Sequence, residues 1–298
     1  MENADRHRSD PSTVSSRETG LAVSHILART LFGIQHLHYG YWPPEMPVEV
    51  ANVAAAQERY TEELISAIPD DVESILDVGC GPATNALRLL DRGYEVECVQ
   101  PPGPLADLAR QALAGRAPLH TTFFQSFSCE RDYDLVLFSE SLLFIRPLSE
   151  AISKAASLLR EKGYLLICDI FRKPPPGSSE GSDSYHTGPI GGGHYARDFE
   201  AVMASQPLRL LENTDLSPGI APTFDLIARV MGDIRPAYDL VMGKFAGRRP
   251  IATWLLRRVA KLDKYEKKHF RADRDGAAFL ASKEYRRLLY QLDSDAHG

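Results

Sequence analysis

The residues best suited to chemistry in this sequence surround a short glycine turn. A β-type hydrophobic stretch at 74–78 carries Asp77 and is followed by Gly79, Cys80 and Gly81, after which a helical pattern begins. Glycines let backbone N–H groups approach a ligand where a side chain would clash. A strand, a glycine turn and a helix in this order form the unit with which doubly wound α/β proteins hold an adenosine-containing cofactor. The pattern therefore predicts such a site here.

Three further side chains are candidates for acid–base chemistry. Glu140 follows a continuously apolar segment at 133–138, which predicts a place at the carboxyl edge of a parallel sheet, where ligands bind. In an apolar pocket the pKa of its carboxyl rises, which suits it to remove a proton from an acceptor atom. His36 and His38 are candidates for a general base or a metal pair. Because no third ligand stands at a recognisable spacing, we predict no metal site.

The elements that must position these residues alternate regularly along the chain. Alternation of strand and helix patterns predicts an α/β fold, a doubly wound, mostly parallel, Rossmann-like sheet with helices on both faces. The strands are expected at 74–78, 94–99, 120–124, 133–138, 164–170, 208–215 and 285–292, and the core helices at 84–91, 105–113, 148–159 and 196–204.

The chain is expected to divide into five parts. They are a disordered tail at 1–20, an N-terminal helical lid at 21–70, a cofactor-binding core at 71–220, an inserted helical cap at 221–283 and a final core strand with a tail at 284–298. A Pro-, Gly- and Ser-rich loop at 172–193 is interpreted as a functional lid or a disordered segment. The cap carries a cluster of basic residues, which is typical of a solvated helix face and also suits an anionic acceptor or a partner subunit: Lys261, Lys264, Lys267, Lys268, Arg271 and Arg274.

Composition limits the classes of function. The 298 residues carry a net charge of -6, which gives no overall attraction to nucleic acid, and aromatics are not interleaved with the basic residues. The four cysteines show no paired spacing, which is typical of a reducing compartment. No stretch approaches the roughly 20 apolar residues of a membrane span, and the N-terminal segment lacks the apolar centre of a signal peptide. We predict a cytoplasmic protein with no nucleic-acid or membrane partner.

Two motifs carry a resemblance to a known family. The sequence LDVGCGPAT at 76–84 resembles the first motif of class I S-adenosylmethionine-dependent methyltransferases. The segment HYGYW at 38–42 resembles an element of small-molecule methyltransferases of the cyclopropane-synthase, tocopherol and sarcosine/dimethylglycine type, where it belongs to a lid over the cofactor. The resemblance implies methyl transfer from S-adenosylmethionine to a small molecule. The apolar cap favours a hydrophobic, specialised-metabolite acceptor.

The resemblance also implies a set of cofactor-binding residues, some of which depart from the family pattern. Gln100 stands where relatives usually carry the acid that binds the ribose hydroxyls, and Gln125 or Ser126 is the polar candidate for the adenine. Ala83 stands where the third glycine is usual. The full predicted set is Tyr39, Asp77, Gly79, Cys80, Gly81, Gln100, Pro101, Gln125, Ser126 and Ser139, with Glu140, His36 and His38 as the catalytic candidates.

Two alternatives follow from the same residues. The missing ribose carboxylate is typical of a degenerate methyltransferase fold that acts as a structural or regulatory subunit beside a catalytic partner. A nicotinamide-dependent oxidoreductase also uses a Gly-x-Gly turn, but Gln100 and the Gly-Cys-Gly-Pro-Ala spacing argue against that class. The acceptor, the atom that is methylated and the choice between homo- and hetero-oligomer are left open.

Overall fold

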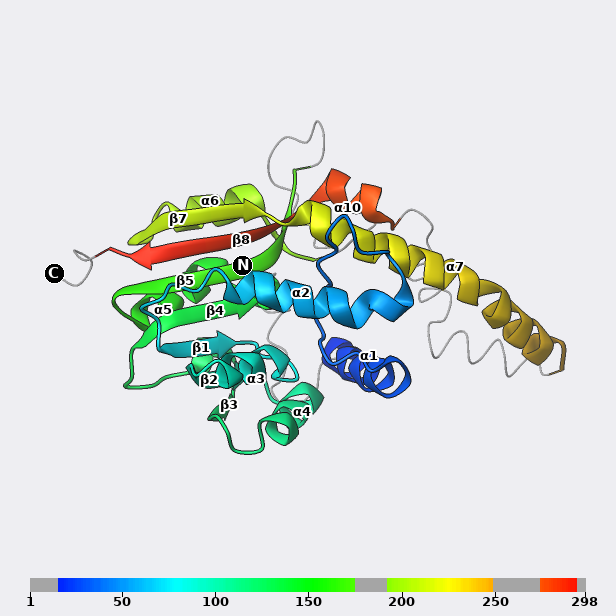
Figure 1. Ribbon diagram of the computed structural model, residues 1–298, viewed down its shortest axis with the longest axis horizontal. Coiled ribbons are helices and arrows are strands. Elements are labelled where there is room, and N and C mark those ends of the chain that lie inside the picture. The colour runs from blue at the N-terminus through cyan, green and yellow to red at the C-terminus, as the bar shows by residue number, and fades with distance from the viewer. Residues whose placement is uncertain (1–15, 175–191, 249–273, 294–298) are drawn as a thin grey trace, which may run out of the picture.

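The computed structural model describes residues 16–174, 192–248 and 274–293. Its centre is an eight-stranded sheet of order β3-β2-β1-β4-β5-β8-β7, with β6 paired to the end of β5 (Figure 1). Every pair is parallel except the two that β8 forms with β5 and β7. The strands are β1 (Ser74–Val78), β2 (Glu95–Gln100), β3 (Leu119–Thr121), β4 (Tyr133–Ser139), β5 (Leu159–Arg172), β6 (His194–Tyr195), β7 (Leu208–Asp215) and β8 (Lys283–Leu292).

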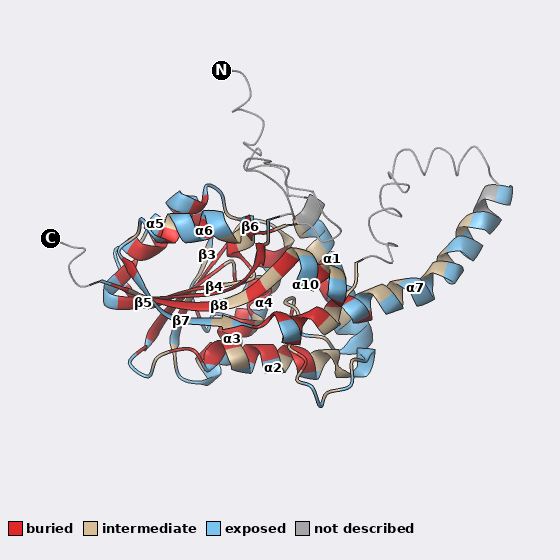
Figure 2. Cartoon of the chain, turned by 90° about the horizontal axis from the view of Figure 1, so that it is seen from above, coloured by how far each residue is buried: buried red, intermediate tan, exposed pale blue. Residues whose placement is uncertain are grey.

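Helices cover both faces of this sheet (Figure 2). The helices are α1 (Ser16–Phe32), α2 (Val53–Ile65), α3 (Thr84–Asp91), α4 (Pro104–Leu113), α5 (Leu148–Ser157), α6 (Ala196–Met203), α7 (Ser217–Arg248) and α10 (Gly276–Ser282), with short 3-10 turns η1 (Val50–Asn52), η2 (Phe124–Ser126) and η3 (Leu142–Phe144). Buried side chains of α2, α3 and α4 share one core cluster, and those of α5 and α6 share another. The predicted doubly wound α/β fold is confirmed.

The central strands are buried on both faces because each face has its own helical layer. In β1, Ile75 belongs to the cluster with α2 and α3, whereas its neighbour Leu76 belongs to the cluster with α5. Successive side chains of a strand point to opposite faces, so a strand between two layers must be apolar at every position except those that bind something. In β1 the polar residues are Ser74 at its start and Asp77 near its carboxyl end, and Ser139 is the polar residue that ends β4.

Several elements differ from the sequence prediction. Helix α1 begins at Ser16, inside the segment expected as a tail. Strand β5 runs from Leu159 to Arg172 rather than over 164–170, because it pairs with β4, β6 and β8 along its length. Strand β3 is short and ends at Thr121, since it lies at the sheet edge and pairs only with β2. The last strand enters between β5 and β7 and is antiparallel to both.

The predicted cap is described only in part. Helix α7 begins at Ser217, within the predicted core, and continues away from the body of the protein (Figures 1 and 2). The chain returns through α10, whose Phe279 stacks on Phe224 of α7 with ring centroids 4.5 Å apart. Residues 249–273, which include the basic residues expected at 261–271, lie outside the described residues, as does the 175–191 part of the predicted loop.

Candidate active site

A cavity of about 500 Å³ opens at the carboxyl ends of β1, β2 and β4. Strand β1 lies between β2 and β4, so the connections leave it in opposite directions, and this is where open α/β sheets bind ligands. The segment that joins α1 to α2 also lines the cavity. The predicted site residues found in its lining are His38, Tyr39, Gly79, Cys80, Gly81, Gln100, Pro101, Gln125, Ser139 and Glu140.

The glycine turn forms one wall of the cavity, and the absence of a side chain serves a different purpose at each of its two glycines. Both adopt positive φ angles, 76° at Gly79 and 57° at Gly81. A Cβ on Gly79 would lie 2.5 Å from the Cβ of Ser141, so the protein's own packing requires this glycine. A Cβ on Gly81 would have only Leu37 Cδ2 within 4 Å, at 3.9 Å. The bare backbone of Gly81 therefore faces open space in the cavity.

Gln100 ends β2 and is bonded to the glycine turn. Its Oε1 accepts a hydrogen bond of 2.9 Å from the backbone N–H of Gly81. The Nε2 amino group forms no hydrogen bond within the described part of the chain, and the side chain lines the cavity. Gln100 thus orders the turn with its oxygen and leaves two N–H donors for a ligand.

Glu140 follows β4 and also lines the cavity. Its φ angle of 52° is costly for a residue with a Cβ, and such strain is often found at functional sites. Its Oε1 accepts two hydrogen bonds of 3.0 Å, from the backbone N–H of Tyr39 and from the hydroxyl of Tyr285. Burial raises the pKa of this carboxyl to about 8, and nearby Asp169 acts in the same direction, while the two donors oppose the rise. A carboxyl with this pKa can exchange a proton near neutral pH.

A chain of hydrogen-bonded hydroxyl groups leads from Glu140 into the protein interior. The hydroxyls of Tyr285 and Tyr60 lie 2.7 Å apart, and the Tyr60 hydroxyl lies 3.0 Å from Oγ of Ser139. Asn85 donates to the same Oγ at 3.2 Å. Ser139 is therefore part of a network that fixes the carboxylate, as well as a lining residue.

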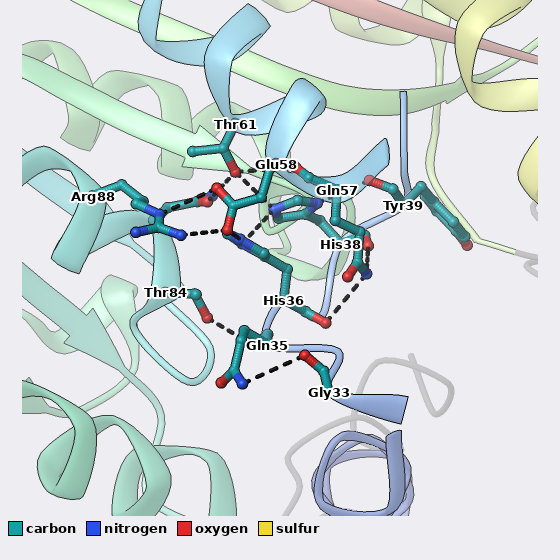
Figure 3. Close-up of polar contacts among 11 residues, drawn as sticks. Gly33, Gln35, His36, His38, Tyr39, Gln57, Glu58, Thr61, Thr84 and Arg88 are labelled. Carbon is teal, nitrogen blue, oxygen red and sulfur yellow. Dashed lines mark hydrogen bonds and ion pairs between the residues drawn. The ribbon is translucent and has the colours of Figure 1, made fainter. Parts of the chain in front are cut away.

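The two histidines link the segment between α1 and α2 to side chains of α2 and α3 (Figure 3). Nε2 of His36 lies 3.1 Å from Oε1 of Glu58, which also pairs with Arg88. Nδ1 of His38 lies 2.8 Å from the carbonyl oxygen of Tyr39, and its Nε2 lies 2.9 Å from Nδ1 of His36. Both rings are thus engaged by protein groups at both nitrogens.

This arrangement does not favour either histidine as the base. Burial and the neighbouring His36 lower the pKa of His38 to about 3, and burial also lowers the pKa of His36 although Glu58 opposes the shift. His38 lines the cavity, whereas His36 does not. Through His38 and Tyr39 the pair instead positions the backbone N–H that binds Glu140.

Asp77 and Ser126 also lie outside the cavity lining. Asp77 is buried in β1, and its Oδ2 has no hydrogen-bond partner. Burial raises the pKa of its carboxyl to about 7. Ser126 belongs to η2, next to Gln125, which does line the cavity. A contact of Asp77 or Ser126 with the cofactor therefore stays a prediction.

Two residues of the site were not predicted from the sequence. Glu18 comes from α1 and lines the cavity; burial raises the pKa of its carboxyl, while the backbone of Leu105 at the start of α4 opposes the rise. Tyr285 supports Glu140 from the last strand. No local signal marks either residue, since each acts on a segment far away in the sequence. The apolar part of the lining includes Leu37, Phe123, Phe124, Leu143, Phe144, Ile145 and Ile170.

The described residues contain no group of three or more His, Cys, Asp and Glu side chains placed to hold a metal ion. None of the helices described has both the length and the apolar character needed to cross a membrane.

Comparison with known proteins identifies the family. The model of a family described as a methyltransferase domain matches residues 53–209, more than half of the chain. The chain belongs to this methyltransferase family. The predicted family is therefore confirmed, and the predictions of a methyltransferase enzyme and of S-adenosylmethionine as its cofactor agree with it.

Curated relatives match part of this methyltransferase. Uncharacterized methyltransferases of Mycobacterium tuberculosis and Mycobacterium bovis are 29% identical over 126 residues, which cover 41% of this chain and 51% of each relative. The chain thus spans about half the length of the curated relatives it matches.

Solved structures share the fold of the methyltransferase over nearly the whole chain. Geranyl diphosphate C-methyltransferase from Streptomyces coelicolor has a TM-score of 0.63 at 16% identity, with 95% of this chain and 100% of that chain covered. A putative sarcosine dimethylglycine methyltransferase from Galdieria sulphuraria has a TM-score of 0.62 at 13% identity, with 93% and 99% covered. The [4+2]-cyclase SpnF has a TM-score of 0.60 at 16% identity, with 93% and 96% covered. At these identities the likeness is one of fold.

Proposed function

We propose that this chain transfers a methyl group from S-adenosylmethionine to a small, apolar acceptor bound beside Glu140. The observation that carries the proposal is a single cavity lined by both the glycine turn and a carboxylate of raised pKa. Bound S-adenosylmethionine supplies an electrophilic methyl group on a sulfonium. The residues of the chain then have to hold the two reactants, exclude water and accept the proton that the acceptor loses.

The residues present fit the cofactor. The side of Gly81 that a Cβ would fill is open, so a ligand can approach the backbone closely. Gln100 offers N–H donors to sugar oxygens in place of the usual carboxylate, and Phe124 and Leu105 offer apolar surface to a purine. The N-terminus of α3 follows the turn, and its positive end suits the carboxylate of the cofactor's methionine part.

Glu140 is the residue that we assign to proton transfer. One of its oxygens is held by Tyr39 and Tyr285, while Oε2 has no hydrogen bond within the described chain and is not among the buried unpartnered atoms. Oε2 therefore faces the cavity and can accept a proton from an acceptor. The apolar side chains around it exclude water, and alignment of two bound reactants is itself a large part of such catalysis.

Cofactor binding is tested by calorimetry with S-adenosylhomocysteine on three proteins. We expect Gly81→Ala to lower affinity at least tenfold, because its methyl group occupies the open side of the turn. Gly93→Ala is the matched control, since Gly93 also has a positive φ angle, 92°, and open space, but lies at the end of α3 outside the cavity lining. Equal affinity in the two variants contradicts the assignment. No binding by the wild type favours the subunit alternative.

Methyl transfer is tested separately on Glu140→Gln. With a panel of apolar acceptors and radiolabelled donor, we expect turnover to fall at least a hundredfold while the affinity for S-adenosylhomocysteine stays within a factor of about two. Normal turnover would remove the proton-transfer role from Glu140 and leave the cofactor site unaffected.

A further inference from the structure

The ionisable side chains that line the cavity are mainly acidic. The described lining residues include two carboxylates, Glu18 and Glu140, and no lysine or arginine. The one basic side chain among them is His38, which burial keeps neutral by lowering its pKa to about 3. Neither of its ring nitrogens is available to a ligand, because both lie against protein atoms.

A third carboxyl group lies close to Glu140. Asp169 of β5 is buried, and it raises the pKa of Glu140 through its charge. Its Oδ2 accepts from the backbone N–H of Leu143, which itself lines the cavity. Arg274 acts on Tyr39 from a position outside the lining, so a cation is near the site but does not face the ligand space.

The walls beside Glu140 are apolar and partly aromatic. Leu143, Phe144 and Ile145 follow Glu140 in the chain and line the cavity, as does Tyr39, whose backbone N–H binds Glu140. Alone in these surroundings the Glu140 carboxyl has a raised pKa, and a cation that pairs with it favours its ionised form. Aromatic faces attract cations as well. An anion would meet two carboxyl groups and, among the described lining residues, no lysine or arginine, and burial of an unpaired charge is costly.

We infer that the acceptor is an apolar amine, whose nitrogen is bound by the free Oε2 of Glu140, and that anionic acceptors are rejected. This inference rests on the proposed function. The nitrogen first needs its lone pair, so an ammonium form passes a proton to Oε2. When the neutral nitrogen attacks, the N–C bond forms, the methyl–sulfur bond breaks with its electron pair on sulfur, and the product carries the charge until its proton is lost to solvent.

The inference is tested with three small probes of one skeleton: benzylamine, benzyl alcohol and benzoate. Each is titrated by calorimetry into the full-length protein saturated with S-adenosylhomocysteine. We expect benzylamine to bind at least tenfold more tightly than benzyl alcohol, and benzoate not to bind at millimolar concentration, because hydrogen bonds to charged partners are roughly twice as strong as neutral ones. Benzoate binding equal to that of benzylamine, or no binding by any probe, overturns the inference.

Two variants locate the effect. Glu140→Gln should weaken benzylamine at least tenfold and benzyl alcohol less than threefold, because the amide keeps the shape but loses the charge. Glu18→Gln removes the other carboxyl group of the cavity and should change benzylamine affinity less than threefold, since Glu18 belongs to α1 and lies beside Leu105 at the start of α4. Equal losses in both variants would show a diffuse field rather than pairing with Glu140, and would contradict the inference. The preceding titration with S-adenosylhomocysteine keeps this failure distinct, because loss of cofactor binding refutes the proposed function instead.

Discussion

Replacement of Asp77 by asparagine should make the protein more stable at neutral and alkaline pH. Asp77 is buried in the centre of the sheet, and its Oδ2 has no hydrogen-bond partner. Burial alone raises the pKa of its carboxyl from 3.8 to about 7. In the folded protein the carboxyl therefore stays protonated to a higher pH than in the unfolded chain.

The sign and size of the effect follow from this difference in pKa. Between about pH 4 and pH 7 the folded state holds a proton that the unfolded state has released, so stability falls as pH rises through this window and stays low above it. At about 1.4 kcal/mol for each pKa unit, the loss is at most about 4 kcal/mol. Asparagine does not ionise, so Asp77→Asn lacks this loss.

The assay is urea unfolding of wild type and variant from about pH 4 to pH 8. Glu140 and Asp169 also have raised pKa values and act in the same direction, so the difference between the two proteins isolates Asp77. We expect a small difference at pH 4 that grows to several kcal/mol in favour of the variant at pH 8. A pH-independent difference, or a variant that is less stable at pH 8, refutes the reasoning.

Asp134 provides a control of opposite sign in the neighbouring strand. Burial raises the pKa of Asp134, but hydrogen bonds from the backbone N–H groups of Ser74 and Glu73 outweigh it, so the pKa is lowered overall. Its contribution to stability is present above the ordinary pKa of an aspartate and is lost as pH falls. Asp134→Asn should therefore destabilise the protein at pH 8 and lose that effect in acid.

Three further outcomes follow from the geometry of the site. Gly79→Ala should destabilise the protein by about 2–5 kcal/mol in thermal or urea unfolding, because its Cβ would lie 2.5 Å from the Cβ of Ser141 and its φ angle is positive; stability equal to wild type refutes this. Gln100→Glu should bind S-adenosylhomocysteine about tenfold more tightly, since one oxygen keeps the bond to Gly81 and the other can accept from the sugar; weaker binding in calorimetry would show that Gln100 meets a different group. Tyr285→Phe removes a donor to Glu140, so the acid limb of the pH–rate profile should move to higher pH, and an unmoved limb would contradict the support role.

The parts of the fold that were predictable are those that depend on neighbours in sequence. The bounds of β1 and β7 and the end of α3 were predicted to the residue, because hydrophobic runs, turns and a glycine after the helix are local signals. Ala83 stands where the resemblance places a third glycine, and its φ angle of 64° shows that the backbone there is left-handed, a conformation that favours glycine.

Most of the predicted site residues line one cavity, but their contacts could not be predicted from the sequence. Glu140 could be placed at the sheet edge because it follows an apolar strand, yet its partner Tyr285 is 145 residues away and has no local signal. His36 and His38 have the residue type of a base, but Glu58 and the carbonyl of Tyr39 occupy their nitrogens. The role of a histidine depends on its burial and its hydrogen-bond partners, and the neighbouring residues in the sequence predict neither.

Strand β8 makes the assembly of this site a late event in folding. It fills the gap between β5 and β7, and it carries Tyr285 to the carboxylate of Glu140. During synthesis, the edge of β5 that pairs with β8 stays without this partner until Lys283–Leu292 has left the ribosome. Unpaired strand edges of this kind promote association between chains. The same strand that completes the sheet thus also completes the proposed site, so a nascent chain lacks the hydrogen bond from Tyr285 to Glu140 before its sheet is closed.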